Sequence, residues 1–344
     1  MLRLILLGCA LLLSACTEQP PLAAKAPLRD LAQWYHRHIG TSVDEAAFNT
    51  DSQYRELMAR EFSSVTPENV LKFERVHPAP QHYDFSQADA LMDFAVANGM
   101  SVHGHTLLWH QQLPQWLLEG GYSSAELKSI LRDHVHTVVG HFRGRIPLWD
   151  VVSEGIDEDG RLRDSFWLRG IGPDYIALAF EWAHEADPQA KLLYNDYANE
   201  GINKKSDAIF RLIQQLRLQH VPLHGVGMQM HLSSDYVPGS RELDRNMRRL
   251  RAVGMEVHIT EMDVRLRIPA SDDALARQAH IYRTMLDSCL AADNCRSFTV
   301  WGFTDRYSWI PDFFPGWGAA LLFDDRFRPK PAYHALVERL RRRD

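Results

Sequence analysis

Short apolar runs alternate with longer amphipathic stretches along almost the whole chain. Eight of the runs have the length and composition of β-strands, and they lie at residues 36–43, 62–68, 100–109, 146–154, 190–197, 223–231, 255–263 and 297–305. Stretches with the helical period lie between or after them, for example at residues 86–99, 123–142, 203–220, 272–290 and 331–343. Eight strand–helix units without a change of composition predict a single-domain α/β fold, a (β/α)8 TIM barrel.

Polar and aromatic residues stand at the carboxyl ends of seven of these predicted strands. They are Glu68, Asn69, His103, His105, Trp109, Glu154, Asn195, Asp196, Gln229, His231, Glu261, Asp263, Trp301 and Asp305. The carboxyl-terminal face of a TIM barrel is the face that carries the active site. The pattern therefore predicts that these side chains meet in one functional site.

Two of these strand ends carry glutamates with different surroundings. Glu154 follows an apolar strand that contains Trp149, a setting that can raise the pKa of a carboxyl group. Glu261 has His231 and Asp263 as candidate hydrogen-bonding neighbours, which would keep it ionised. Cleavage of a glycosidic bond needs one proton-donating carboxyl group and a second carboxylate. This pair therefore indicates a glycoside hydrolase.

Six segments resemble the motifs of glycoside hydrolase family 10, the retaining endo-β-1,4-xylanases. "TPENVLKF" is similar to the family's TxENxxKW, and "GHTLLWHQQLPQW" is similar to GHTLxWHxQxPxW. "LYNDY", "GMQMH", "ITEMD" and "TVWGFTDRYSW" follow in the order of the family. The resemblance runs from about His36 to Leu340 and implies hydrolysis of xylan or xylo-oligosaccharides, with no metal and no organic cofactor.

The resemblance assigns roles to matching positions of this chain. It implies that Glu154 is the acid/base, that Glu261 is the nucleophile, and that Glu68, Asn69 and Lys72 hold the sugar on the non-reducing side. His231 and Asp263 are expected to support the nucleophile. The full set of expected substrate-binding residues is Glu68, Asn69, Lys72, His105, Trp109, Gln112, Ser153, Asn195, Tyr197, Gln229, His231, Trp301 and Trp309.

The segment "WDVVSEG" departs from the family pattern WDVVNEA at two positions. The family asparagine binds the 2-hydroxyl of the sugar at the cleavage site, and Ser153 is too short to replace it directly. Gly155 in place of alanine is expected to open this corner further. Three interpretations follow: a water bridge in a slower xylanase, a changed or 2-substituted glycan as substrate, or glycan binding with little turnover.

Two other classes of function are compatible with parts of the sequence. A metal-dependent hydrolase would use His103, His105, His231 and Asp305 as ligands, but the H-x-H pair falls on the third strand and no lysine suited to carboxylation ends the fourth. A surface-tethered glycan-binding lipoprotein would not need two catalytic carboxylates. Both expected carboxylates are present, which favours an enzyme.

The amino terminus has the features of an export signal. Arg3 precedes an apolar stretch, and Leu13, Ser14, Ala15 and Cys16 resemble a bacterial lipobox, although an ordinary secretory signal would look similar. We therefore predict a lipoprotein-type signal over residues 1–16, lipidation of Cys16, a tether over 17–30 and a catalytic domain over 31–344. Thr17 suggests, by resemblance, lipid anchoring to the outer membrane.

Charge and cysteine content refine this picture. A net charge of -6 argues against nucleic acid as a partner, and contact with a membrane is expected only through the lipid. Outside the signal region the chain has two cysteines, Cys289 and Cys295, around a short loop. In an oxidising compartment they predict a disulfide, with two free thiols as the alternative. A monomer is the default expectation for this architecture.

Overall fold

Eight parallel strands close into a barrel in the computed structural model, which describes residues 26–342. They are β1 (His38–Val43), β2 (Ser64–Pro67), β3 (Ser101–Gly104), β4 (Leu148–Ser153), β5 (Lys191–Asp196), β6 (Gly225–Met228), β8 (Glu256–Arg267) and β9 (Cys295–Val300). β1 pairs in parallel with both β2 and β9, and β8 pairs with β6 and β9, which closes the barrel. The predicted (β/α)8 fold is confirmed, and each of the eight predicted strands is present.

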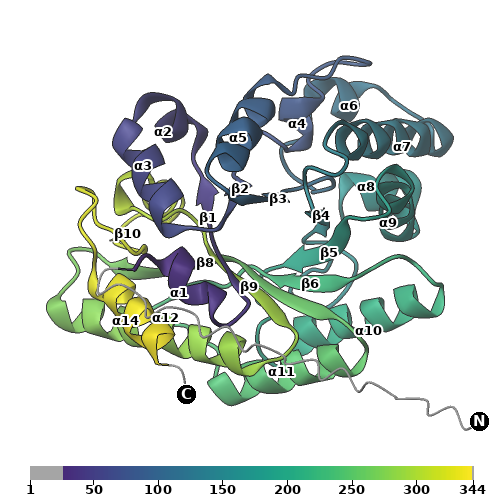
Figure 1. Ribbon diagram of the computed structural model, residues 1–344. Helices are drawn as coiled ribbons and strands as arrows, with labels where there is room; N and C mark the ends of the chain where they lie inside the picture. The colour runs from purple at the N-terminus through teal and green to yellow at the C-terminus, as the bar shows by residue number, and fades with distance from the viewer. Residues whose placement is uncertain (1–25, 343–344) are drawn as a thin grey trace, which may run out of the picture.

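Helices surround the barrel (Figure 1). They are α1 (Leu28–Gln33), α2 (Glu45–Thr50), α3 (Ser52–Glu61), α4 (Phe73–Val76), α5 (Ser86–Ala97), α6 (Gln115–Glu119), α7 (Ser124–His141), α8 (Phe166–Ile171), α9 (Tyr175–Ala186), α10 (Lys204–Leu218), α11 (Ser240–Ala252), α12 (Asp272–Ala291), α13 (Ile310–Phe313) and α14 (Pro331–Arg341). A single 3-10 turn, η1 (Asp305–Tyr307), also lies within the described residues.

Helix α7 illustrates why these segments are helical. Ser123 accepts a hydrogen bond from the backbone N–H of Glu126, whose side chain reaches back to Ser123, so the amino end has a capping box. Leu127, Leu131 and Val135 recur at helical spacing and are buried. The apolar stripe therefore fixes which face of α7 packs toward the barrel.

Two short strands that the sequence did not predict extend the barrel at the end of β8. β7 (His231–Ser233) pairs with residues 263–265 of β8, and β10 (Trp317–Gly318) pairs antiparallel with residues 266–267. β8 therefore continues beyond the barrel wall. Since side chains alternate along a strand, Glu261, Asp263 and Arg265 share one face of it.

The folded domain begins before the predicted boundary at residue 30. Leu28 and Leu31 of α1 are fully buried, and the backbone N–H of Leu28 donates to Oε2 of Glu61 at 3.2 Å. α1 lies against α14 (Figure 1), so both ends of the described chain pack together. Residues 28–30 thus belong to the barrel domain, and the predicted tether ends earlier. The predicted signal and Cys16 lie outside the described residues.

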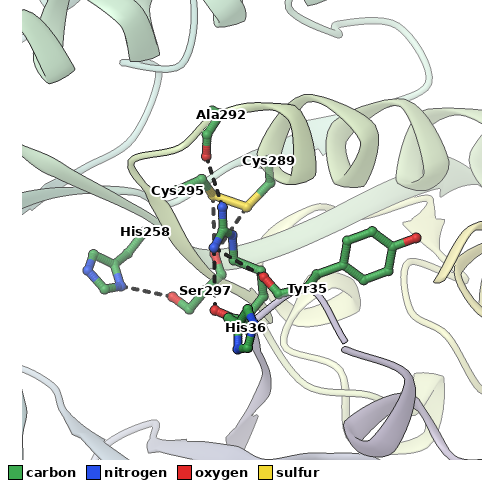
Figure 2. Close-up of a disulfide and its surroundings, with 8 residues drawn as sticks. Tyr35, His36, His258, Cys289, Ala292, Cys295 and Ser297 are labelled. Atoms are coloured by element: carbon green, nitrogen blue, oxygen red, sulfur yellow. Dashed lines mark hydrogen bonds between the residues drawn. A yellow bond between two sulfur atoms is a disulfide. The ribbon is translucent and has the colours of Figure 1, made fainter. Parts of the chain in front are cut away.

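Cys289 and Cys295 form a disulfide in the structure, with a Cα–Cα distance of 5.3 Å. Figure 2 shows it joining the end of α12 to the start of β9, close to Ser297. The Ser297 hydroxyl lies 2.9 Å from Nδ1 of His258. Cys295 opens its strand, so the disulfide lies at the amino-terminal end of the barrel, away from the polar strand ends.

Candidate active site

Glu154 and Glu261 line one cavity of about 640 Å³ at the carboxyl ends of the strands. Glu154 follows the last residue of β4, and Glu261 lies within β8. Parallel strands of a barrel gather their carboxyl ends on one face, so residues far apart in the sequence meet there. The predicted gathering of strand-end side chains is therefore present in the structure.

Glu261 is buried, with two hydrogen-bonding side chains and a third polar side chain nearby. Nδ2 of Asn195 donates to its Oε1 at 2.6 Å, Nε2 of His231 lies 3.2 Å from its Oε2, and Nδ1 of His105 lies 4.0 Å from Oε1. Burial alone would raise the pKa of Glu261, but the His231 hydrogen bond and the nearby imidazoles of His105 and His231 outweigh it. The pKa therefore lies below the usual value of a glutamate, and the carboxylate stays ionised.

His231 bridges two carboxylates. Its Nδ1 lies 2.8 Å from Oδ2 of Asp263, while its Nε2 faces Glu261. Burial would lower the pKa of His231, but Asp263 and Glu261 raise it to about 10. The ring is therefore a cation at neutral pH and donates from both nitrogens. Nε1 of Trp309 also donates to Oδ2 of Asp263 at 2.9 Å. Trp309, in the cavity wall, is thereby connected to Glu261 through Asp263 and His231.

Glu154 is held more loosely than Glu261. Nε2 of Gln229 donates to its Oε1 at 3.2 Å, and Nδ1 of His110 lies 3.7 Å from its Oε2. Burial lowers the pKa of His110, which favours the neutral ring beside the carboxyl group. The side chain of Glu154 is 13% exposed, against 5% for that of Glu261. Glu154 thus has access to water and few fixed partners.

The backbone of Glu154 is fixed even though its side chain is not. Its φ is 58°, in the left-handed region that side-chain-bearing residues rarely adopt. Its N–H donates to the Asn195 carbonyl at 2.9 Å, and its own carbonyl accepts from Nε of Arg163 at 2.7 Å. Nη2 of Arg163 donates to the Tyr197 hydroxyl at 2.8 Å. Arg163 was not predicted from the sequence, because it lies in a loop outside the motifs and outside any periodic apolar pattern.

Ser153 turns its hydroxyl toward a neighbouring strand end. Its Oγ donates to Oγ1 of Thr106 at 3.1 Å, and Thr106 donates to the carbonyl of Asp150 at 3.0 Å. Ser153 also lines the cavity. The position of Gly155 differs from the expectation of extra room. A Cβ built there would lie 3.2 Å from the hydroxyl of Tyr175, so side chains already fill this corner.

Asn69 links the polar residues at another part of the cavity wall. Its Oδ1 accepts from Nζ of Lys72 at 3.2 Å and from Nε2 of Gln112 at 3.3 Å. Its backbone N–H donates to Oε1 of Glu45 at 2.7 Å. Nζ of Lys72 lies 4.7 Å from the ring centre of Trp109. Three expected sugar-binding side chains are thus oriented before any ligand arrives.

Glu68 has a pKa raised to about 8, because burial outweighs the hydrogen bond that its Oε1 accepts from Ser42 at 2.7 Å. At neutral pH this carboxyl group is largely protonated and can donate a hydrogen bond. A donor and an acceptor on one side chain suit a sugar hydroxyl. Glu68 is therefore suited to hydrogen bonding with a sugar rather than to acting as a negative charge.

Tryptophans form the apolar part of the cavity wall. The His105 ring lies edge-on to Trp301 at 5.2 Å, and the His231 ring lies edge-on to Trp309 at 4.9 Å. The indoles are therefore packed against the same imidazoles that surround Glu261. Flat aromatic faces of this kind provide large contact areas for ligands at low conformational cost.

The structure brings nearly all of the expected site residues to this cavity. Those that line it are Glu68, Asn69, Lys72, His105, Trp109, Gln112, Ser153, Glu154, Tyr197, Gln229, His231, Glu261, Trp301 and Trp309. Asn195 and Asp263 are fully buried behind the wall instead. The place of Asn195 does not support direct contact with sugar, because its amide points at Asp150 and Glu261.

Asp150 is the main buried residue that the motifs did not single out. Its two carboxylate oxygens lie 3.0 Å from Nε2 of His103 and 2.9 Å from Nδ1 of His105. Burial would raise the pKa of Asp150, but the two imidazoles hold it well below its usual range. Apolar residues flank Asp150 on both sides within β4, and a charged residue inside such a buried run was the available signal.

The ligand set of the metal-hydrolase hypothesis is not assembled. His103 and His105 both face Asp150, His231 bridges Glu261 and Asp263, and Asp305 pairs with Nζ of Lys330 at 2.8 Å. Within residues 26–342, His105, Asp150 and Glu261 are close enough to share an ion, since their donor atoms lie within 4.8 Å of one another. Asp150 already hydrogen-bonds His105, and Nδ2 of Asn195 donates to both Asp150 and Glu261. His103, His231 and Asp305 are not members of that set.

Comparison with known proteins agrees with the geometry. Glycosyl hydrolase family 10 matches residues 27–339. Endo-1,4-beta-xylanase B of Thermotoga neapolitana is 43% identical over 341 residues, covering 98% of this chain and 96% of the relative. Endo-1,4-beta-xylanase 1 of Humicola insolens is 38% identical, covering 94% of this chain and 74% of the relative.

Solved structures show the same likeness in three dimensions. Native xylanase 10B from Thermotoga maritima superimposes with a TM-score of 0.89 at 42% identity, covering 91% of this chain and 98% of that one. Xylanase 10B from Thermotoga petrophila RKU-1, solved in complex with xylobiose, gives 0.90 at 42% identity, covering 93% and 98%. With the family matched over nearly the whole described chain, this protein belongs to glycosyl hydrolase family 10.

Proposed function

We propose that this protein is a retaining endo-1,4-β-xylanase, which cleaves β-1,4-xylosidic bonds in xylan or xylo-oligosaccharides. One observation carries the proposal: Glu154 and Glu261 reach one cavity from two strands, with tryptophans in its wall. The relatives that are named endo-1,4-β-xylanases align over nearly the full chain, which supports the substrate class. They do not favour a changed glycan or binding without turnover.

The proposed mechanism is a double displacement. In the first step Glu261 attacks the anomeric carbon, and Glu154 gives its proton to the leaving oxygen, so the glycosidic bond breaks as a glycosyl–enzyme ester forms. In the second step Glu154 takes a proton from water, which attacks the anomeric carbon and releases Glu261. His231 and Asn195 keep Glu261 ionised and oriented for the first step.

Sugar binding in this proposal combines stacking with hydrogen bonds. Trp301 and Trp309 offer flat faces at the cleavage site, and Asn69, Lys72 and Gln112 offer donors and acceptors. Indoles there would crowd the position where glucose carries its extra CH₂OH group, so a pentose chain fits better. This gives a physical reason for a preference for xylan.

The test is hydrolysis of xylohexaose followed by proton NMR. We expect the β-anomer of the product to appear first and the α-anomer only through mutarotation, because two inversions at one carbon retain its configuration. Initial formation of the α-anomer would contradict the two-step mechanism. Absence of turnover by the native protein would contradict the proposed activity itself.

The finer parts of the proposal concern location and assembly. We propose that the chain is exported, lipidated at Cys16, held at the outer membrane and monomeric. The lipobox-like segment and the disulfide support export. None of the helices described between residues 26 and 342 is long and apolar enough to cross a bilayer.

Detergent phase partitioning of the full chain from bacterial membranes tests the anchor. The native protein should enter the detergent phase, and Cys16→Ala should remain in the aqueous phase. Equal partitioning of the two forms would contradict lipidation at Cys16. Sedimentation equilibrium of the purified protein should give the mass of one mature chain, and twice that mass would contradict a monomer.

A further inference from the structure

Arg265 lines the same cavity as the two glutamates. It follows Glu261 by four positions on β8, and the alternation of side chains places both on one face of the strand. Four residues of extended strand span about 13 Å. Arg265 is therefore about 13 Å along the strand from Glu261 but still lines the same cavity.

Arg265 has no anionic partner in the described part of the chain. Within residues 26–342 its guanidinium forms no ion pair with a carboxylate, and its Nε is buried without a hydrogen-bond partner. Its one hydrogen bond runs from Nη1 to the Leu232 carbonyl at a long 3.4 Å. A guanidinium keeps its charge at any physiological pH, so this positive charge stays uncompensated by side chains.

Two aromatic rings hold the guanidinium in place. Its Cζ lies 4.2 Å from the ring centre of Phe314 and 5.5 Å from that of Trp317. Stacking on aromatic faces restrains the planar group while it leaves N–H donors at its edge for a ligand. The arrangement is preorganised for an acceptor with two oxygens, such as a carboxylate.

The neighbouring cations lack this combination of features. Arg267, two residues further along β8, lies 3.7 Å from Oδ2 of Asp235 and is not part of the cavity wall. Lys72 lines the cavity, but its Nζ donates to Asn69 and it lies in the field of Glu261 and Glu68. Arg265 is thus the cavity cation whose charge a substrate would balance.

We propose that Arg265 binds the carboxylate of an acidic branch sugar, a uronic acid carried by the xylan chain. The proposal rests on the proposed xylanase function and adds a substrate class to it. Phe313 and Tyr236 line the cavity as well and are 69% and 54% exposed. Their exposed rings offer apolar faces against which a branch sugar can pack.

The experiment compares two matched substrates: glucuronic-acid-substituted xylan, and the same polymer after its carboxyl groups are reduced to alcohols. The readout is the ratio of kcat/KM on the acidic polymer to kcat/KM on the reduced one. We expect Arg265→Gln to lower this ratio about tenfold, the usual effect of losing a charge-assisted hydrogen bond. Arg267→Gln, the matched control on the same strand, should keep the native ratio.

Arg265→Lys keeps the charge without the fork of donors, so its ratio should fall between those of the native protein and Arg265→Gln. High salt should lower the native ratio because it screens exposed charges. A native ratio near one, or equal ratios for the native protein and Arg265→Gln, would overturn the proposal. Turnover of xylohexaose by the native protein, measured alongside, tests the proposed function separately.

Discussion

The two carboxylates of the cavity have different surroundings, although both come from strand ends of the same barrel. Glu261 is nearly enclosed, and its oxygens contact Asn195 and the cationic ring of His231. Glu154 is more exposed and has one hydrogen bond of 3.2 Å, from Gln229. Glu261 is held in its charged form by its neighbours, whereas Glu154 keeps access to water and a single side-chain hydrogen bond.

This difference matches the demands of a double displacement. A nucleophile has to be ionised and aimed before the substrate arrives, and a buried carboxylate can remain ionised only if neighbours balance the cost of desolvation. An acid/base gives a proton in one step and takes one back in the next, so fixed cationic partners would hinder it. The structure thus holds Glu261 rigidly among hydrogen-bonding partners and leaves Glu154 in a more open setting.

Replacing Glu261 should have the largest effect. We expect Glu261→Ala to lower kcat/KM on xylohexaose by more than about 10⁴-fold, beyond the usual contribution of a general acid–base group, because no covalent intermediate can form. Initial rates of product release measure this. Glu185→Ala, at an exposed ion pair with Arg132, is the matched control and should keep native activity. Retained turnover in Glu261→Ala would refute its role.

Replacing Glu154 should have a smaller effect that depends on the leaving group. Glu154→Ala is expected to lose about 10²–10⁴-fold on xylohexaose, the range for general acid–base catalysis. With a dinitrophenyl xylobioside the leaving group needs no proton, so the first step should stay fast and a burst of phenol should appear. Glu261→Ala should show no burst with the dinitrophenyl xylobioside. A uniform loss in Glu154→Ala on both would contradict the assignment of the acid.

The strand pattern predicted the barrel because buried parallel strands read as apolar runs, and each of the eight runs became a strand. The short strands β7 and β10 were missed, since runs of two or three residues carry no detectable period. Both form only because the extended part of β8 offers them a partner.

The sequence predicted which residues gather at the candidate site, but not which of them line the cavity and which lie buried behind its wall. Motifs placed Asn195 among the sugar contacts, whereas the structure turns it inward toward Glu261. Which face a residue at a strand end presents depends on the register between strands, and here the β4–β5 pairing contains an irregularity. Arg163 was missed because its contact with the Glu154 carbonyl arises from the path of a loop.

Removing the cation beside Glu261 should weaken the contrast between the two carboxylates. In His231→Gln the positive charge that helps hold the pKa of Glu261 below its usual value is lost, and a neutral amide replaces the charged donor, so that pKa rises. The acid limb of kcat/KM against pH should move up by about 1 pH unit or more, with the larger loss of activity at low pH. A loss that is equal at all pH values would show that His231 acts only through packing.

Unfolding experiments on the same variant provide an independent readout. The pKa of His231 is raised to about 10 in the folded protein, so the stability that it contributes is fully present below its unfolded value near 6.5. That stability is lost as the pH rises from there through about 10. The native protein should therefore lose more stability over this window than His231→Gln does.

The smallest expected effect concerns Ser153, at the looser of the two carboxylates. Its hydroxyl donates to Thr106, whose own hydroxyl already donates to the Asp150 carbonyl. Replacing the serine removes the hydrogen bond that Oγ1 of Thr106 accepts, but the Thr106 hydroxyl keeps its own acceptor. No buried donor is left unpaired, so the fold should tolerate Ser153→Asn. Because Ser153 lines the cavity, the longer amide can extend toward the 2-hydroxyl of the sugar.

One added hydrogen bond in the transition state contributes about 0.5–1.5 kcal/mol, so kcat/KM on an aryl xylobioside should rise by about two- to tenfold in Ser153→Asn. The matched substrate lacks the 2-hydroxyl of the sugar at the cleavage site. With that 2-deoxy substrate the native protein and the variant should have the same kcat/KM, because the new donor finds no partner. An equal gain on both substrates would show that the asparagine acts on Glu154 rather than on the sugar. No gain on either would mean that the serine already serves the 2-hydroxyl, through water, as well as an asparagine does.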